Sequence, residues 1–203
     1  MSAKITDRRI KRTQDALMRA MQELIIEKGF GAMTIQELTD RANVGRSTFY
    51  QHYESKEDLL LSGFDELKAM LQGKTDNGTA SAPKRGVRLL NFTTNLFQHL
   101  HENVSLFRAM AGRQGGALLK QGMEKMIEEL VLEDLMRSFG GKNIQENEML
   151  FACKMTAGAF SSLIPKWLGI EPVLPPTEVE NTFRQYVLSG ISAVMGLPKK
   201  AIK

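Results

Sequence analysis

The sequence predicts an all-α protein of about nine helices, with a small N-terminal three-helix unit followed by a larger helical bundle. Apolar residues recur at spacings of three and four, which is the periodicity of a helix with one buried face. The 203 residues include only six prolines, and runs of β-branched residues are few. Two helix-start signatures are also present: Thr34 precedes Glu37, and Ser55 precedes Asp58, by three residues.

The first predicted helix covers about residues 8–28. Its apolar face holds Ile10, Leu17, Met21, Leu24 and Ile25. Gly29, followed by an apolar residue, is a typical helix stop.

The next two predicted helices are short and closely spaced. The first starts at Thr34 and has Ile35, Leu38 and Ala42 on its buried stripe. Residues 43–45, Asn-Val-Gly, should break it, and a second helix then runs from Arg46 to about residue 53. Two short helices joined by such a turn form a helix-turn-helix, whose second helix enters the major groove of DNA.

These residues also carry a family resemblance. Residues 34–59 follow the pattern T-I-x-E-L-x-x-x-A-x-V-x-x-x-T-F-Y-x-H-Y-x-S-K-E-D-L, which resembles the DNA-binding segment of TetR-type (TetR/AcrR) transcriptional regulators. Gly45 and Ser47 depart from it, because the family usually has Ser and often Gly there. The stretch FQHLHENVSLFRAM, residues 97–110, resembles part of the C-terminal region of one TetR subgroup. The resemblance implies a dimeric DNA-binding protein whose second domain typically holds a small effector.

The candidate DNA contacts fall into two groups. Arg46 is the strongest candidate for reading bases, because a guanidinium can pair bidentately with guanine, and Ser47 and Gln51 can both donate and accept. The expected contacts to the phosphate backbone, which position a protein without reading sequence, are Thr34, Thr48, Tyr50, His52 and Lys56. The alternative is that this helix face is simply solvated.

The charge distribution favours the same region. Residues 1–53 hold nine of the 27 basic residues and six of the 23 acidic ones, so most of the net charge of +4 lies there. Residues 1–12 are expected to form a basic arm, either a solvated terminus or a contact to DNA. Excess positive charge suits a surface that faces phosphates.

We expect a DNA-binding domain over residues 1–54 and a ligand-binding and dimerisation domain over residues 55–203. The helix predicted for residues 55–72 would link them. Further helices are expected at about 84–103, 104–111, 118–138, 145–168 and 176–195, with the sequence GRQGG at 112–116 as a flexible break.

The last two predicted helices carry small residues and a long apolar stripe, which favour close packing of helices. We expect a dimer interface there, and the alternative is that both helices close the core of a single chain. The predicted interface residues are Phe160, Ser162, Phe183, Val187, Gly190, Ile191 and Val194.

Eight of the twelve methionines lie in the second domain, beside several aromatic residues. Met-rich surfaces adapt to apolar ligands, although Met and Phe at helical spacing are more often ordinary core. The candidate effector pocket consists of Phe92, Asn95, Leu96, His99, Phe107, Arg108, Met123, Met126, Phe151 and Met155.

Other functional classes find little support. The single cysteine, Cys153, excludes an intramolecular disulfide and a cysteine metal cluster. His99 and His101 should point to different helix faces, so no metal site is expected. No catalytic grouping or phosphate loop appears in the sequence either, and no cofactor is expected. The N-terminus lacks a signal-peptide core and no apolar run could span a membrane, so a bacterial cytoplasmic protein is expected.

The resulting hypothesis is a homodimeric repressor that leaves a palindromic operator when a small apolar or aromatic effector binds. One alternative is an activator, or a regulator that answers a protein or an oxidant. Another is a ligand carrier or enzyme with a vestigial DNA-binding unit, against which the basic N-terminal region counts.

Overall fold

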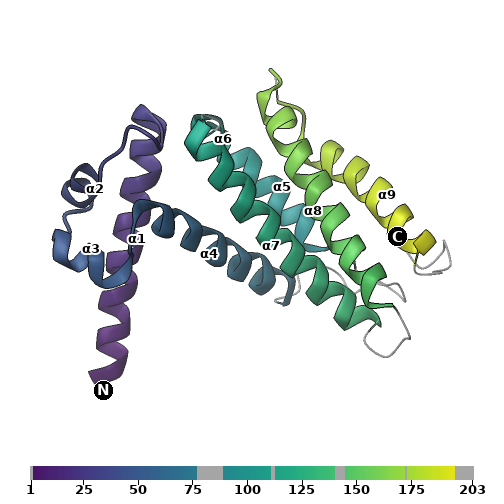
Figure 1. Cartoon of the computed structure of the whole chain (residues 1–203), viewed down its shortest axis with the longest axis horizontal. Coiled ribbons are helices and arrows are strands. Elements are labelled where there is room, and N and C mark those ends of the chain that lie inside the picture. The colour runs from purple at the N-terminus through teal and green to yellow at the C-terminus, as the bar shows by residue number, and fades with distance from the viewer. Residues whose placement is uncertain (1, 77–88, 111–112, 140–144, 172, 195–203) are drawn as a thin grey trace. The chain divides into compact units, whose positions relative to one another are not determined.

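In the computed structural model, the described residues are 2–76, 89–110, 113–139, 145–171 and 173–194 (Figure 1). Within these ranges the chain forms nine helices and no strand, which confirms the predicted fold class. The helices are α1 (Ser2–Lys28), α2 (Ile35–Ala42), α3 (Arg46–His52), α4 (Lys56–Asp76), α5 (Phe92–Glu102), α6 (Val104–Met110), α7 (Arg113–Phe139), α8 (Glu146–Gly169) and α9 (Pro176–Val194).

Residue contacts divide the chain into two compact units. Unit 1 comprises Met1–Glu66 and Ser105–Leu119, and unit 2 comprises Leu67–Val104 and Lys120–Lys203. Helices α4 and α7 therefore contribute residues to both units. The domain boundary expected after residue 54 stays a prediction.

The helix ends of unit 1 follow local chemistry. Gly29 ends α1 at φ +79°, and its N–H donates to the Ile25 carbonyl over 2.9 Å. Asn43 ends α2 in the left-handed region, at φ +52°, a conformation that asparagine tolerates better than most residues. Gly45 caps α3 without a side-chain hydrogen bond.

The start of α2 has the predicted capping box. The Thr34 hydroxyl accepts from the Glu37 N–H over 3.2 Å, and the Glu37 carboxylate accepts from the Thr34 N–H over 3.0 Å. Lys28, on α1, also donates to Glu37. The hydrogen bond from Lys28, followed by that from the Thr34 backbone, lowers the pKa of Glu37 from 4.5 to about 2.

Unit 1 is built on one hydrophobic core. Leu17, Met21, Leu38 and Phe49 are fully buried in it. Met110 of α6 is part of the same core, and other apolar residues of α6 and α7 pack against it: Leu106, Ala109, Leu118 and Leu119. This shared core explains why residues 105–119 belong with the first helices.

Two expected boundaries are corrected. Residues 2–12 of the expected basic arm are helical, since α1 begins at Ser2. The expected break at 112–116 is wrong for the described part, because α7 begins at Arg113. Gly115 is buried in this helix, and a Cβ there would lie 2.7 Å from the Met110 carbonyl oxygen. Glycine is thus needed for close packing of α6 on α7 rather than for flexibility.

Unit 2 has an aromatic centre. The Phe97 ring of α5 lies 5.1 Å from Phe160, 5.3 Å from Trp167 and 5.7 Å from Phe183, between ring centroids. Phe160 and Phe183 also meet edge to face at 5.4 Å. These contacts join α5, α8 and α9, and aromatic pairs at such distances add to the stabilisation from burial.

A buried polar network joins α5 and α9. The Glu180 carboxylate accepts from the Thr93 hydroxyl over 2.8 Å and from the Thr94 hydroxyl over 3.1 Å. Arg184 lies 3.5 Å from Glu180 and donates to the Leu90 carbonyl over 2.6 Å. Leu90 has φ +60°, a conformation that leucine rarely adopts, so this network must hold it there.

We predict that Arg184→Met lowers the free energy of unfolding by about 3 kcal/mol, because removing one partner leaves the buried Glu180 carboxylate uncompensated. Urea unfolding at a fixed protein concentration measures this. The matched control is Lys154→Met, since both partners of the Lys154–Glu128 pair are accessible to solvent and the pair should contribute less than about 1 kcal/mol. Equal losses in the two variants would contradict the assignment.

We also predict a pH-dependent contribution from Glu37. Its pKa is lower in the folded state than the ordinary 4.5, so its stabilisation is fully present above pH 4.5 and is lost as the pH falls toward 2. The difference in unfolding free energy between the wild type and Glu37→Gln should therefore be largest at neutral pH and should shrink over that range. A difference that stays constant would show that the carboxylate charge is not involved.

Candidate nucleic-acid interface

Helix α3 has one buried side and one exposed side. Phe49 is fully buried, and its ring lies 5.3 Å from Tyr50 and 5.9 Å from Tyr53. The residues predicted to read bases, Arg46, Ser47 and Gln51, are all exposed. Burial of Phe49 therefore fixes which side of this short helix faces outward.

Two of the exposed side chains support each other. The Arg46 guanidinium lies over the Tyr50 ring, 5.8 Å from its centroid. Tyr50 is 49% exposed, so the pair lies at the surface and restricts the arginine without covering it. Such a cation–π contact contributes about 0.5–1 kcal/mol at an exposed site. It leaves the guanidinium hydrogen-bond donors free to point at a base edge.

The residues predicted to contact the phosphate backbone differ in their exposure. Tyr50 is exposed, and Thr48 and His52 are half-buried on the same helix. Thr34 is exposed, but its hydroxyl already takes part in the capping box and also donates to Glu37 over 2.9 Å. Thr34 therefore has a structural role whether or not it touches a phosphate.

Lys56 makes internal contacts that the sequence did not predict. Its ammonium donates to the carbonyls of Phe30 and Met33, in the turn between α1 and α2, over 3.0 and 2.8 Å. The half-buried side chain thus points into unit 1. The sequence offered no signal for this contact, because donor and acceptors are more than twenty residues apart.

The ten predicted effector residues do not gather at one place. Phe92, Leu96, Met123 and Met126 are buried in unit 2, where Asn95 and His99 are half-buried. Phe107 and Arg108 belong to α6 in unit 1. Phe151 and Met155 are 60% and 74% exposed on α8.

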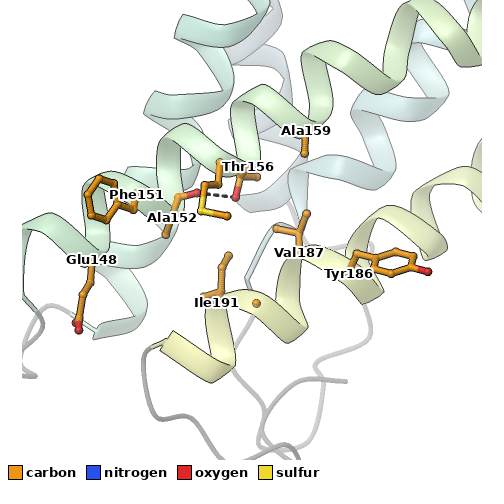
Figure 2. Close-up of a pocket in the computed structure, with 10 residues that line it drawn as sticks. Glu148, Phe151, Ala152, Thr156, Ala159, Tyr186, Val187 and Ile191 are labelled. Atoms are coloured by element: carbon orange, nitrogen blue, oxygen red, sulfur yellow. Dashed lines mark hydrogen bonds between the residues drawn. The ribbon is translucent and has the colours of Figure 1, made fainter.

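A groove of about 260 Å³ lies between α8 and α9 in unit 2 (Figure 2). Val187 and Ile191 extend from α9 toward α8, whose Phe151, Met155 and Ala159 line the other wall. The Thr156 hydroxyl, the hydrogen-bonding side chain drawn in this wall, donates its proton to the Ala152 carbonyl over 2.7 Å. The lining is therefore mostly apolar.

The residues predicted for a dimer interface separate into two groups. Val187, Gly190 and Ile191 line the groove, and Ser162 is exposed. Phe160 and Phe183 are buried in the aromatic centre of their own chain, so their assignment to an interface is corrected. The side chain of Val194 lies outside the described residues. Phe151, Met155 and Tyr186 line the same groove but were not among the predicted interface residues, although the spacing of four between Phe151 and Met155 places them on one face of α8.

The described residues contain neither a metal site nor a reactive cysteine. No group of three or more histidine, cysteine or acidic side chains there could hold a metal ion. Burial raises the pKa of the Cys153 thiol, which disfavours the reactive thiolate. None of the helices in the described ranges has the length and apolarity needed to cross a bilayer.

Comparison with known proteins agrees with this geometry. Residues 17–62 match the family profile described as "Bacterial regulatory proteins, tetR family", and residues 88–188 match "Transcriptional regulator C-terminal region". The HTH-type transcriptional regulator YxbF of Bacillus subtilis (strain 168) is 44% identical over 55 residues, which are 27% of this chain and 14% of YxbF. The matched segments cover 14, 63 and 22% of the first three curated relatives.

Solved structures share the fold. The dihydroxyacetone kinase operon activator DhaS matches with a TM-score of 0.63 and 17% identity, over 90% of this chain and 97% of DhaS. FadR of Thermus thermophilus, a TetR family repressor solved with lauroyl-CoA, matches with a TM-score of 0.59 and 22% identity, over 88% of this chain and 94% of FadR. Since profiles match both its N-terminal and its C-terminal region, the chain belongs to the TetR family of bacterial regulatory proteins.

Proposed function

We propose that the protein is a homodimeric transcriptional regulator that binds a near-palindromic DNA operator through α3. The observation that carries this proposal is the outward side of α3 in a TetR-family helix-turn-helix. Phe49 is buried there, while Arg46, Ser47, Tyr50 and Gln51 are exposed. Binding to the chromosome would occur in the cytoplasm.

The outward residues have separate roles in this proposal. Arg46 reads a guanine, held by its contact with the Tyr50 ring. Ser47 and Gln51 contact neighbouring base edges. Thr48, Tyr50 and His52 bind phosphate oxygens and fix the register of the helix on the duplex.

The surface formed by α8 and α9 is the proposed dimer interface. Phe151, Met155 and Tyr186 expose 60, 74 and 77% of their surface in the single chain. A Cβ at Gly158 or Gly190 would meet no atom within 4 Å, so a partner helix could approach closely at both positions. A two-fold dimer would place two copies of α3 at successive half-sites about one helical turn apart.

A small apolar or aromatic effector is proposed to bind in unit 2 and to release the operator. It would do so by favouring a spacing of the two DNA-binding units that does not match the half-sites. FadR, a repressor, was solved with lauroyl-CoA, so the shared fold is compatible with an apolar ligand. DhaS is an activator, and activation is therefore the second candidate, which a reporter gene under the operator distinguishes.

We predict that Arg46→Ala weakens binding to the operator about 10- to 100-fold, because one bidentate base contact is lost. Tyr50→Ala should also weaken binding, by removing a phosphate contact and the support of Arg46. The measurement is a titration with a duplex that the wild-type protein selects from a random pool. Arg137→Ala, at an exposed arginine of α7, is the control. The site assignment fails if both α3 variants bind like the wild type.

We predict that Met155→Asp converts the dimer to a monomer at micromolar concentration, because a carboxylate would be buried in an apolar interface. Sedimentation or light scattering measures the mass. Met136→Asp is the matched control, since Met136 is 58% exposed on α7 and lies outside the groove. A monomeric wild type, or a Met155→Asp dimer as stable as the wild type, would refute this interface.

A further inference from the structure

Helix α2 is joined to α1 by ion pairs near both of its ends. Near its N-terminal end, the Lys28 ammonium of α1 donates to the Glu37 carboxylate. Near its C-terminal end, the Arg41 guanidinium donates to Glu27 of α1 through two nitrogens, Nη1 over 2.8 Å and Nη2 over 2.9 Å. Nη1 also donates to Glu23, one turn earlier on α1, over 3.2 Å. Arg41 therefore holds two carboxylates of the neighbouring helix at once.

The pair between Arg41 and Glu27 has a fixed geometry. Two parallel N–H···O bonds between a planar guanidinium and a carboxylate define direction as well as distance. The hydrogen bond from Arg41 lowers the pKa of the Glu27 carboxyl, so this group stays charged. The two side chains are 36 and 51% exposed, and such pairs contribute little to stability. The arrangement is therefore better suited to fixing geometry than to holding the unit folded.

The signs of these charges specify the register of α2 on α1. The apolar contacts beneath α2, such as those of Leu38, are not directional. Glu37 and Arg41 are about one turn apart on α2. Sliding α2 by one turn along its axis would bring Glu37 to the place of Arg41, beside two carboxylates, and the opposite slide would bring Arg41 beside Lys28. Both slides place like charges together, whereas the observed register pairs opposite ones.

The position of α2 passes directly to α3. Arg41 is the last residue but one of α2. The break that follows is hydrogen-bonded back to this helix, since the Val44 N–H donates to the Thr39 carbonyl over 3.0 Å. Gly45 then caps α3. Because the break is so short and is fixed to α2, a shift of α2 on α1 would displace α3 as well.

We propose that Arg41 is a positioning residue, whose forked ion pair with Glu27 fixes the register of α2 on α1 and thereby sets the orientation of α3 on DNA. Arg41 acts through this internal pair rather than through a contact with the duplex. Glu27 shares the role, although an acidic side chain would otherwise oppose binding to phosphates. The inference rests on the proposed DNA-binding function, because its consequence is sequence-specific binding.

The test measures Arg41→Gln and Glu27→Gln on two duplexes of equal length. One is the duplex that the wild-type protein selects from a random pool, and the other has the same bases in shuffled order. Each variant should bind the selected duplex about three- to fivefold more weakly, the scale of one exposed ion pair, with no such loss on the shuffled duplex. For Glu27→Gln, charge alone would act in the opposite direction, because removing a carboxylate lessens the repulsion from phosphates.

The matched control is Asp65→Asn, which removes an exposed carboxylate of α4 within unit 1. This variant should bind the selected duplex no more weakly than the wild type. An equal loss in Asp65→Asn and Glu27→Gln would contradict the proposal, because the effect would then not depend on the pair with Arg41.

The double variant distinguishes one shared pair from two separate contributions. Because Arg41 and Glu27 act through the same interaction, losing both should weaken specific binding no more than losing one. A loss equal to the product of the two single losses would overturn the proposal. So would a weakened Arg41→Gln whose slope of log K against log salt is reduced by about 0.9, together with a Glu27→Gln that binds like the wild type, since Arg41 would then contact a phosphate.

Amide hydrogen exchange in the free protein tests the ion pair without DNA. Exchange over residues 38–44, the second half of α2 and the start of the break, should be faster in Arg41→Gln and Glu27→Gln than in the wild type. Unchanged exchange would contradict the positioning role. A wild type that selects no sequence would refute the proposed function. Faster exchange in the two variants would then still show that the pair holds α2, so the two failures can be told apart.

Discussion

The burial of Phe49 is the constraint on which the DNA-binding unit depends. A helix of seven residues such as α3 has little stability of its own, so packing must hold it in place. Phe49 supplies that packing, with contacts to Tyr50 and Tyr53 and a place in the core formed by α1 and α2. Because residues two positions apart on a helix point in nearly opposite directions, burying Phe49 also turns Ser47 and Gln51 outward.

The same reasoning separates the two sides of α8 in unit 2. Phe160 and Trp167 lie one above the other on the inward side and meet Phe97. Phe151 and Met155 lie on the outward side, where they are more than half exposed. A helix with apolar residues on both sides is typical of a chain that packs in two directions, first against itself and then against a partner.

Local chemistry made the DNA-binding segment predictable from the sequence. The capping box at Thr34, the break at Asn43 and the buried position of Phe49 all depend on residues within a few positions of one another. Long-range packing was not predictable in this way. The apolar and small residues of the last two helices could face either a partner or the core of the same chain, and only the packing shows that Phe160 of α8 and Phe183 of α9 meet Phe97 of their own chain.

The helical position of Gly115 and the internal contacts of Lys56 could not be predicted from the sequence, for a related reason. A glycine pair usually marks a break, and only the approach of Met110 reveals why a helix needs glycine at residue 115. A lysine at a helix start beside a DNA-binding motif suggests a phosphate contact. Its ammonium donates to the carbonyls of residues 30, 31 and 33, which no local pattern connects to it, and its contact with a phosphate stays a prediction.

The turn at residues 29–33 is contacted from two directions within unit 1. Lys56 of α4 holds its carbonyls, and on another side a Cβ at Gly31 would lie 3.0 Å from the Gln114 Oε1 atom of α7. Both helices continue into unit 2, where Lys68 of α4 pairs with Glu129 and Glu133 of α7 over 2.9 and 2.8 Å. The turn before α2 and the ion pairs of Lys68 therefore involve the same two helices, each within its own unit.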